Sequence, residues 1–576
     1  MKRPLLRLLS LLAFIPLAAR GTIVTTVEDE DDGLLGGGTG ISLREAVKYS
    51  PIADTVTFAP ALSGQTIRLT LGELPITQSL TIDGSALAAR LTLSGDKTGD
   101  GKTADDARVI QISNNTTVVL NTLAIIGGSG TAGGGIRISG LSSGSTRVTI
   151  RNSAFIGNAA SGSGGAIYCG GDLDIQNSSF TGNSANSGAG IFLAHRSINL
   201  ENTIFSSNAA SNQGGAIYAR GTLSMRNCVV TGHTASSGGG IHIQRDTLPL
   251  IATLENSTIS DNSVVGYGGG IYNFGGTLTL RNSTCSRNYA APSGGGIYHH
   301  NGSLLIENST LSGNRAKGDA GGVYAGFGSV SLRNSTVSGN TANSFAGGGI
   351  NNRDDDLILT LDSSIVAGNV ALNAPLYPDI SGPFTGSSNI TSGNPRLAPL
   401  GDYGGPTHTM PPLPGSPAID AGGTTTLTTD QRGLPRLSTP DIGAAEYQGT
   451  ADLLRFWKLD PDGDGSPYGA EQALGTDPSV ADSASPRRLT GPTLDASGHA
   501  VLTFGIGTAA PGTRWILSRS TDLLHFSEIY RYDGGTTDTA APGITHLRTA
   551  TTVTITDGNP PPGGAFYRFE AVLDSH

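Results

Sequence analysis

The feature that most constrains the fold is a repeat that runs from Arg147 to Asn369. Each copy holds an apolar-x-apolar-x-Asn-Ser/Thr segment, a second asparagine six residues after the first, and a Gly-Gly-x-Ile motif that an aromatic residue usually follows. The glycine motifs are 24 to 31 residues apart and end at Ile136, Ile167, Ile191, Ile217, Ile241, Ile271, Ile297, Val323 and Ile350. A period of this length is typical of solenoids built from one stacked unit.

The residues within each copy predict short strands. Leu223 and Met225 alternate with Thr222, Ser224 and Arg226, a period of two that places one face of a strand inward. No segment shows a 3.6-residue period with caps, which excludes helical repeats. A single coil cannot bury its apolar face, whereas stacked coils can pair each strand with its copies about 4.8 Å above and below. Parallel strands joined in this way favour right-handed winding.

Asparagine occupies two turn positions in nearly every copy. It tolerates the left-handed backbone of a sharp turn, and stacked amides can bond from coil to coil. The first position holds Asn152, Asn177, Asn202, Asn227, Asn256, Asn282, Asn308 and Asn334, with Ser363 in the ninth copy. The second holds Asn158, Asn183, Asn208, His233, Asn262, Asn288, Asn314, Asn340 and Asn369. The predicted fold is all-β, a right-handed parallel β-helix of about a dozen coils, whose main part covers residues 111–370.

The two ends of the chain differ from the repeat. Lys2, Arg3 and Arg7 precede an apolar run from Leu8 to Ala19, which predicts a signal peptide over residues 1–21. That run is too short to span a bilayer, and no later run is long enough, so we expect no transmembrane span in the mature chain. Strand-like segments separated by Gly/Pro turns predict a small β-sandwich over residues 486–576.

The net charge, the cysteine positions and the signal peptide indicate which partners and which cellular location to expect. The net charge of −10 leaves no basic stripe to neutralise phosphates, so a nucleic-acid partner is not expected. Cys169, Cys228 and Cys285 lie in different repeats, and the last two are separated by two coils, beyond the reach of a disulfide. We interpret all three as small buried apolar residues. The signal peptide predicts a secreted or cell-surface protein, associated with the outer membrane in the latter case.

The repeat resembles a known family. Phe155-x-x-Asn158, Phe180-x-x-Asn183 and Gly164-Gly-Ala-Ile-Tyr168 look like the FxxN and GGAI repeats of chlamydial polymorphic outer-membrane proteins. Those proteins are adhesins carried on autotransporter barrels, and the segments after the repeat leave no room for such a barrel here. The resemblance implies a β-helix and an adhesive role.

Two further segments resemble domains of exported β-helix proteins. Ile41-Ser-Leu-Arg-Glu-Ala46 resembles the CSLREA domain, which implies an N-terminal cap and first coils over residues 22–110, with Ile41 in place of the family's cysteine. Residues 394–448 contain Asp430-Gln-Arg-Gly433 and Asp441-Ile-Gly-Ala-Ala-Glu446, which resemble the choice-of-anchor Q domain. This resemblance implies that residues 371–450 close the β-helix.

An acidic loop predicts a calcium site within the linker 455–485. The loop fits the pattern D-x-[DN]-x-[DN]-G-x5-E, and calcium prefers six to eight oxygen ligands of this kind. It also resembles the spacers of thrombospondin type 3 and dockerin-like segments, which implies a structural Ca²⁺. The expected ligands are Asp460, Asp462, Asp464, the Ser466 carbonyl and Glu471.

Two outward ladders bear on function. The residue before each leading asparagine alternates in charge from Glu201 onward, which penalises a one-coil slip and indicates a structural face. An aromatic stripe follows the Gly-Gly-x-Ile motifs, and alternation directs it outward. It can stack on sugar rings or form part of a protein-binding face, and the alternative is an aromatic stack that stabilises the corner of the coil. Its members are Tyr168, Phe192, Tyr218, His242, Tyr272, Tyr298 and Tyr324.

The sequence alone does not decide whether the protein is an enzyme. Many right-handed β-helices are polysaccharide lyases or glycoside hydrolases, but fold alone supplies no activity. The polar clusters His299-His300 and Arg353-Asp-Asp-Asp356 are interpreted as solvated turns. The sequence favours an extracellular scaffold or adhesin-like protein that binds polysaccharide, cell-surface glycans or surface partners without catalysis, with a lyase or hydrolase as the alternative.

Overall fold

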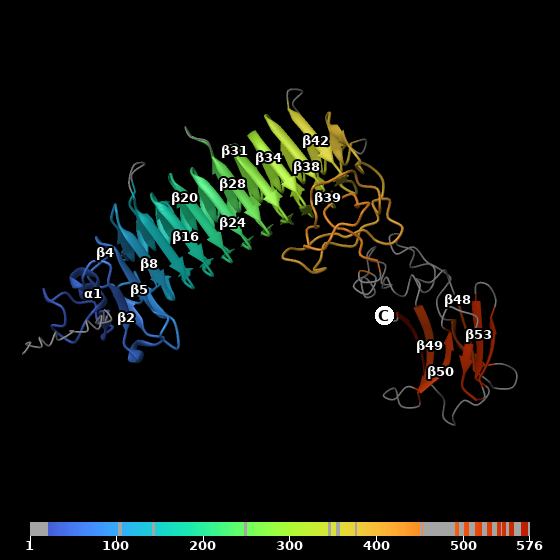
Figure 1. The fold of residues 1–576 in the computed structure, drawn as a ribbon, viewed down its shortest axis with the longest axis horizontal. Coiled ribbons are helices and arrows are strands. Elements are labelled where there is room, and N and C mark those ends of the chain that lie inside the picture. Colours follow the sequence, from blue (N-terminus) through green and yellow to red (C-terminus); the bar gives the residue numbers. More distant parts are fainter. Residues whose placement is uncertain are drawn as a thin grey trace, which may run out of the picture.

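The protein is a stack of parallel β coils followed by an antiparallel β-sandwich. The computed structural model describes residues 21–449 except 102–105, 141–144, 247–249, 344–346, 353–356 and 375–376, then Asp452, and from residue 490 to residue 573 the strands given below. Figure 1 shows the coils stacked along one axis, with the N-terminal segments at one end of the stack. The predicted right-handed parallel β-helix and β-sandwich are confirmed, with about a dozen coils in the stack.

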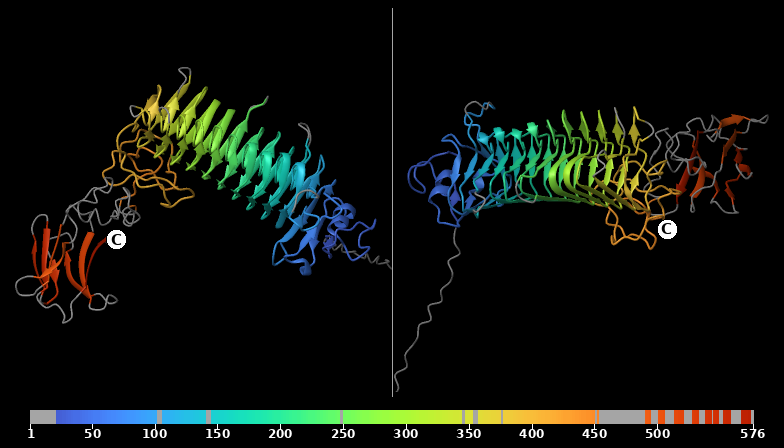
Figure 2. Two further views of the ribbon diagram at one scale, coloured as in Figure 1. Left: turned by 180° about the vertical axis from the view of Figure 1, so that it is seen from behind. Right: turned by 90° about the horizontal axis from the view of Figure 1, so that it is seen from above.

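One coil contains four short strands separated by sharp turns. In the coil that begins at Ile167 these are β15 (Ile167–Cys169), β16 (Asp172–Gln176), β17 (Ser179–Thr181) and β18 (Ser184–Ser187). Each strand pairs in parallel with the same strand of the coils before and after it. Figure 2 shows the resulting layers of strands along the stack from two further sides.

The first two strands of each coil form one sheet of 24 strands. Its first column contains β4 (Leu74–Ile76), β7 (Ile110–Ile112), β11 (Ile136–Ile138), β15, β19 (Ile191–Leu193), β23 (Ile217–Ala219), β27 (Ile241–Gln244), β37 (Val323–Ala325), β41 (Ile350–Asn352) and β45 (Ile380–Ser381). Its second contains β1 (Ile23–Val24), β2 (Thr55–Phe58), β5 (Leu80–Asp83), β8 (Thr117–Asn121), β12 (Arg147–Arg151), β16, β20 (Ser197–Glu201), β24 (Thr222–Arg226), β28 (Ile251–Glu255), β38 (Ser329–Arg333), β42 (Ile358–Asp362) and β46 (Thr385–Ser387). Two long strands, β31 (Ile271–Arg281) and β34 (Ile297–Glu307), run through both columns.

The other two strands of each coil form separate sheets of 12 and 10 strands. The 12-stranded sheet contains β3 (Thr66–Arg68), β6 (Leu91–Ser94), β9 (Leu123–Ile126), β13 (Ala154–Ile156), β17, β21 (Ile204–Ser206), β25 (Val229–Thr231), β29 (Thr258–Ser260), β32 (Thr284–Ser286), β35 (Thr310–Ser312), β39 (Thr336–Ser338) and β43 (Ile365–Val366). The 10-stranded sheet contains β10 (Ser129–Ala132), β14 (Ala159–Ser163), β18, β22 (Ala209–Gln213), β26 (Thr234–Ala235), β30 (Ser263–Val264), β33 (Tyr289–Ala290), β36 (Arg315–Ala316), β40 (Thr341–Ala342) and β44 (Val370–Ala371).

The core consists of inward residues stacked on their own copies. Ile167, Ile191 and Ile217 are fully buried one above another, as alternation predicted. Phe155 and Phe180 stack with ring centroids 4.6 Å apart, and Phe205 continues this stack at 4.7 Å. Because every coil repeats the same apolar positions, one continuous core extends along the stack.

The two asparagine positions form two different ladders. The eight asparagines of the first position have a φ between 43° and 53°, which is the predicted left-handed turn. The second asparagines are buried, and Asn183 shows their contacts. Its Nδ2 donates to Asn208 Oδ1 (2.8 Å) and to the Phe155 carbonyl (3.1 Å), while its Oδ1 accepts the Asn158 backbone N–H (2.9 Å). The Asn183 side chain therefore joins its own coil to the coils before and after it.

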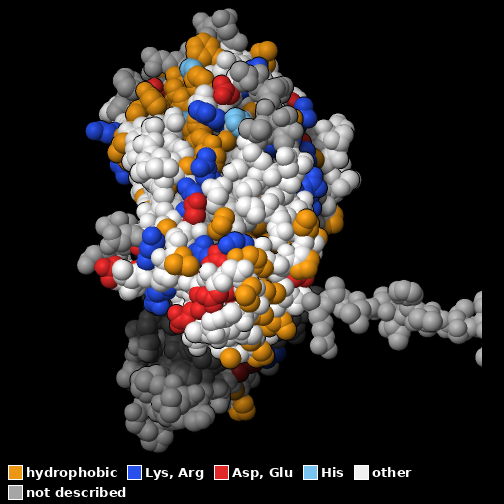
Figure 3. All heavy atoms as spheres, turned by 90° about the vertical axis from the view of Figure 1, so that its left-hand side faces the viewer, with side chains coloured by type: hydrophobic (Ala, Val, Ile, Leu, Met, Phe, Trp, Pro, Cys, Tyr) orange, Lys and Arg blue, Asp and Glu red, His pale blue; other side chains and the backbone are white. Residues whose placement is uncertain are grey.

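The N-terminal end of the stack carries a short helix that sequence reasoning missed. Helix α1 (Leu43–Tyr49) begins at a capping box formed by Ser42 and Glu45, which explains the Ser-Leu-Arg-Glu motif. Arg44 forms a bidentate ion pair with Asp29, at 2.7 and 2.9 Å. Figure 3, a view of this end, shows Asp and Glu side chains gathered below a band of Lys and Arg side chains. A 3-10 turn, η1 (Pro60–Leu62), follows.

Residues 394–449, here called the closing segment, pack along the side of the last coils. Figure 1 shows these loops beside β39. Thr284, Thr310 and Thr336 of the 12-stranded sheet are almost fully buried, and all three bond to the closing segment. The resemblance described above implied a domain that closes the β-helix, and the contacts lie on its flank.

The C-terminal domain consists of two four-stranded antiparallel sheets. One has the strand order β47 (Thr490–Leu494), β48 (Ala500–Gly505), β53 (Thr552–Asp557) and β52 (Ile544–Arg548). The other has the order β51 (Asp538–Ala540), β50 (Ser527–Tyr532), β49 (Thr513–Ser520) and β54 (Phe566–Leu573).

Candidate binding surface

The predicted aromatic stripe forms a continuous stack on the first strand of each coil. Its register follows the ladder from Tyr168 to Tyr324, each ring opposite the next. Neighbouring ring centroids are 4.6 to 5.4 Å apart and the ring planes differ by at most 10°. The preceding isoleucines are buried, so alternation places these rings on the opposite side of the strand.

The middle of this stack is covered. Phe192, Tyr218 and His242 are only 8%, 3% and 1% exposed, so the prediction of an exposed stripe is wrong at these positions. The Arg220 guanidinium lies over the Phe192 and Tyr218 rings, at 5.9 and 5.6 Å from their centroids. A long side chain on the neighbouring turn thus shields the rings that alternation alone would expose. The rings of Tyr168, Tyr272, Tyr298 and Tyr324 are half-buried.

The stacking also changes which part of each ring a ligand can reach. Rings that lie face to face use their π faces on each other, so they present edges and hydroxyl groups to solvent. Burial raises the pKa of the Tyr272 and Tyr298 hydroxyls, which keeps them protonated as hydrogen-bond donors. Sugar stacking on ring faces therefore requires aromatic side chains outside the ladder.

Such side chains exist beside the ladder between residues 267 and 327. Phe274 stacks on His300 at 4.9 Å, and Phe327 contacts His300 edge-on at 5.6 Å with the planes 87° apart. Tyr267 lies 4.7 Å from Tyr298 with the planes tilted by 46°. Tyr267, Phe274 and Phe327 are exposed to 42%, 37% and 49%. We call the following set, which lies outside the ladder, the aromatic patch: Tyr267, Phe274, His300 and Phe327.

The long strands β31 and β34 create the patch. Between β15 and β16 a bend separates the two columns of the large sheet, whereas β31 and β34 continue through that point. This continuation directs Phe274 and His300 to the same side as Tyr272 and Tyr298. His299 is buried and its Nδ1 lies 3.0 Å from Asn273 Nδ2, so the interpretation of His299-His300 as a solvated turn is wrong. Arg353–Asp356 lies outside the described residues.

The charged ladder has the predicted structural role. Arg226 pairs with Glu255 at 3.3 Å and Arg281 with Glu307 at 2.6 Å, each between adjacent coils. These partly exposed pairs contribute little energy singly, but they favour one register. The alternating sign leaves no concentration of one charge on this face.

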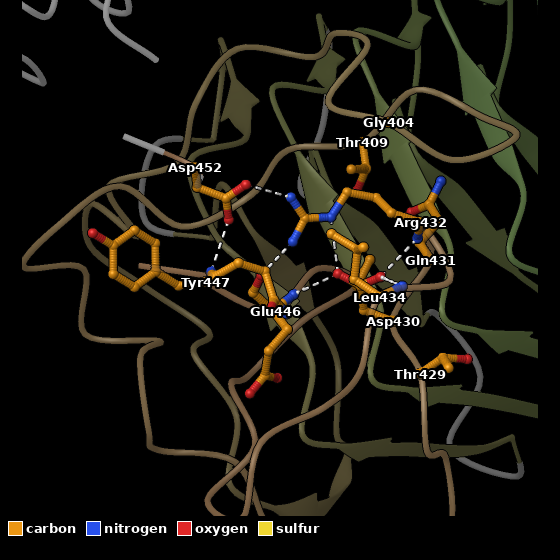
Figure 4. Close-up of polar contacts among 12 residues, drawn as sticks. Gly404, Thr409, Thr429, Asp430, Gln431, Arg432, Leu434, Glu446, Tyr447 and Asp452 are labelled. Carbon is orange, nitrogen blue, oxygen red and sulfur yellow. Dashed lines mark hydrogen bonds and ion pairs between the residues drawn. The ribbon is translucent and has the colours of Figure 1, made fainter. Parts of the chain in front are cut away.

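The closing segment contains a buried ionic network that Figure 4 shows in close-up. The Arg432 guanidinium bonds to Asp430 and Asp452 at 2.9 Å each and to the Glu446 carbonyl, and the two ion pairs have fully buried side chains. Burial raises the pKa of Asp441, which accepts two backbone N–H groups, to about 6. The Asp-Gln-Arg-Gly and Asp-Ile-Gly motifs thus hold the loops of this segment together.

The other predicted sites are located as follows. Asp460, Asp462, Asp464, Ser466 and Glu471 lie outside the described residues. The part of the chain that the structure describes holds no group of three or more His, Cys, Asp or Glu side chains suited to a metal ion. Cys169, Cys228 and Cys285 are free and buried as predicted, and burial raises the pKa of the Cys228 thiol to about 11. No helix among the described residues is long and apolar enough to cross a bilayer.

Comparison with known proteins agrees with this geometry. Residues 152–170 match the family described as the Chlamydia polymorphic membrane protein repeat. Neither the comparison with curated proteins nor that with solved structures gave a match. Residues 189–364, the regular middle of the stack, match the family described as the right-handed β-helix region.

Proposed function

We propose that this chain is an exported scaffold or adhesin-like protein of the cell surface, which binds glycans or surface partners without catalysis. The observation that carries the proposal is the aromatic patch, where Tyr267, Phe274 and Phe327 offer exposed rings beside the aromatic ladder of the large β sheet. The polymorphic membrane protein repeat at residues 152–170 supports a surface location.

The patch has the physical character of a glycan-binding surface. Its tilted rings leave apolar area for sugar C–H groups, and the neighbouring Tyr272 and Tyr298 hydroxyls donate hydrogen bonds. Each contact of this kind is weak, so affinity should rise with glycan length as several rings engage one chain. Catalysis by a lyase or hydrolase would instead require carboxylates and a base gathered on one face.

A binding experiment tests the patch directly. Replacing Tyr267, Phe274 and Phe327 together by Ser should weaken binding to long glycans on an array at least tenfold, with little change in melting temperature, because these rings lie at the surface. Tyr377→Ser with Phe384→Ser is the matched control, since both rings are exposed on the last coil outside the patch. Equal binding by the patch variant and the parent would reject the patch as the site.

The same samples test for catalysis. Acidic and neutral polysaccharides incubated with the full chain should yield neither unsaturated products nor new reducing ends. Turnover of either kind would replace this proposal by the lyase or hydrolase alternative.

We also propose that the acidic loop holds a structural Ca²⁺ through Asp460, Asp462, Asp464, the Ser466 carbonyl and Glu471. The spacing of five oxygen donors around Gly465 supports this ligand set. Asp462→Ala with Glu471→Ala in the full chain should abolish the calcium-binding heat seen by titration calorimetry. Asp354→Ala with Asp355→Ala removes two acidic residues elsewhere and should leave that heat unchanged.

A further inference from the structure

A polar groove lies where the closing segment crosses the ends of the last strands of the large sheet. Its floor is formed by the terminal residues of β34, β38, β42 and β46, which are Glu307, Arg333, Asp362 and Ser387. The loop 423–427 forms the opposite wall, and the groove has a volume of about 430 Å³. That volume lies in the range of small-molecule sites.

The last charged positions of the ladder line this groove. Glu307 is 7% exposed and is already paired with Arg281. Arg333 and Asp362 are aligned as neighbours in the sheet, yet among the described residues no ion pair joins them. The Arg333 guanidinium and the Asp362 carboxylate thus keep their hydrogen-bonding capacity for a ligand, as a donor and an acceptor.

Two outer asparagines beside the groove, Asn308 and Asn334, bond to the closing segment. In the early coils Asn177, Asn202 and Asn227 instead donate to the outer asparagine of the preceding coil, as Asn202 does to Asn177 at 3.0 Å. Near the groove, side chains of the closing segment donate hydrogen bonds to Asn308 and Asn334. Arg436 donates to Asn308 Oδ1 at 2.8 Å, and Thr425 donates to Asn334 Oδ1 at 3.0 Å.

Asn334 is left with an unused donor. Its side chain is 3% exposed, lines the groove, and its Nδ2 has no hydrogen-bond partner. A buried N–H without a partner is costly, so a ligand oxygen at this point would be favoured. This donor does not depend on the charges of Arg333 and Asp362, and it indicates a ligand independently of them.

The combination of groups selects one class of ligand. Arg333 and Asn334 donate, Asp362 accepts, and Ser363, Ser387, Thr424 and Thr426 line the same space with hydroxyls. The unpaired charges of Arg333 and Asp362 sum to zero, which disfavours a strongly anionic ligand. Closely spaced donors and acceptors without net charge match the vicinal hydroxyls of a neutral sugar.

We propose that this polar groove binds one neutral saccharide unit. The ligand class rests on the proposed glycan-binding function, but the residues differ from those of the aromatic patch. Strand β34 carries His300 near its start and Glu307 at its end, seven residues later, so the two sites lie on one sheet at most about 25 Å apart. One extended glycan can therefore engage both.

The test uses the full chain with a panel of free glucose, galactose, mannose and xylose, and with glucuronate and galacturonate, followed by saturation-transfer NMR. At least one neutral sugar should give a saturation-transfer signal. Arg333→Ala and Asp362→Ala should each lower the affinity for that sugar about tenfold. Thr424→Ala with Thr426→Ala, on the exposed side of the loop, should weaken binding of the sugar and leave the stack of coils intact. Arg151→Ala, at the same ladder position in an early coil, is the matched control.

The outcomes separate the two sites. No signal from any neutral sugar, or unchanged signals in both groove variants, would overturn the groove as a saccharide site. If long-glycan binding still depends on Tyr267, Phe274 and Phe327 in that case, the patch proposal stands. Binding of the uronates alone would overturn the neutral-sugar assignment.

Discussion

The same residue types recur at equivalent positions of the coils because each position imposes the same structural requirement in every coil. The outer turn requires a left-handed backbone, which asparagine tolerates, and the inner turn requires a buried amide that both donates and accepts. His233 breaks the inner series. Its Nδ1 accepts the Asn208 backbone N–H at 2.9 Å, while its buried Nε2 has no partner. A residue that leaves a buried nitrogen unpaired in an otherwise complete ladder is expected to reduce stability.

This position predicts a pH dependence of stability. Burial lowers the pKa of His233, His242 and His299 to about 4, from an ordinary value of 6.5. Between those values the unfolded chain binds protons that the folded chain does not, so stability falls as the pH decreases from 6.5 to 4, by up to roughly 3 kcal/mol per histidine. His233→Asn, which completes the ladder, should raise the melting temperature more at pH 5 than at pH 7.5.

The comparison uses thermal denaturation at several pH values. His195→Asn serves as control, because His195 is exposed and should leave the pH dependence unchanged. If His233→Asn shifts the melting temperature equally at both pH values, protonation of His233 does not contribute to acid sensitivity.

At the scale of the element, the aromatic ladder supports the corner of each coil. Six consecutive ring contacts at 4.6 to 5.4 Å run along the stack, so loss of one ring affects two neighbours. The patch beside it has a different role, since its exposed rings lie outside this run. The ladder is therefore expected to stabilise the fold, and the patch to bind.

Replacing Tyr272, Tyr298 and Tyr324 together by Ser tests this division. The change removes the contacts of Tyr298 with Tyr272 and Tyr324 (5.1 and 4.6 Å) and that of Tyr272 with His242 (4.7 Å). Each stacked pair contributes about 0.5–1.5 kcal/mol beyond the buried area, so the free energy of unfolding measured with urea should fall by several kcal/mol. A drop no larger than that of Phe274→Ser with Phe327→Ser would show that the ladder stabilises the fold no more than the patch does and would overturn this division.

Much of this element could be predicted from sequence, and the remainder has an identifiable cause. Period-two alternation and the recurring Asn and Gly-Gly-x-Ile positions predicted the coils, the ladders and the identity of the stacked rings. They could not predict the exposure of Tyr218, because that depends on Arg220 folding over it. They also missed Phe274 and Phe327, since only the continuation of β31 and β34 brings that second group of rings beside the ladder.

At the scale of the whole molecule, the closing segment joins residues that are far apart in sequence. Gln431 bonds to Thr284, 147 residues earlier, and no periodic signal predicts such a contact. The Asn-Ser-Thr series of the later coils was a usable signal, because Thr284, Thr310 and Thr336 occupy the same outward position and are all covered. Because the closing segment lies along this side of the stack, its loop 423–427 and the ends of the last strands enclose the polar groove.

Gln431→Ala should release this segment from the β-helix. The fully buried Gln431 amide donates to Thr284 Oγ1 (3.0 Å) and to the His408 carbonyl (2.9 Å) and accepts from Thr310 Oγ1 (2.6 Å). Its loss leaves several buried polar groups unpaired at about 1–3 kcal/mol each. Limited proteolysis with mass spectrometry should then show rapid cleavage within residues 394–449 while the coils before Thr284 stay protected.

The control is Gln448→Ala, since the Gln448 side chain bonds to the Pro435 carbonyl (2.9 Å), which belongs to the closing segment itself. Its cleavage pattern should match that of the parent. Release of the segment also removes loop 423–427, so the neutral-sugar signal of the groove should disappear in Gln431→Ala while glycan binding by the aromatic patch persists. If Gln431→Ala resists protease as the parent does, the ionic network around Arg432 and the other flank contacts hold the segment without it.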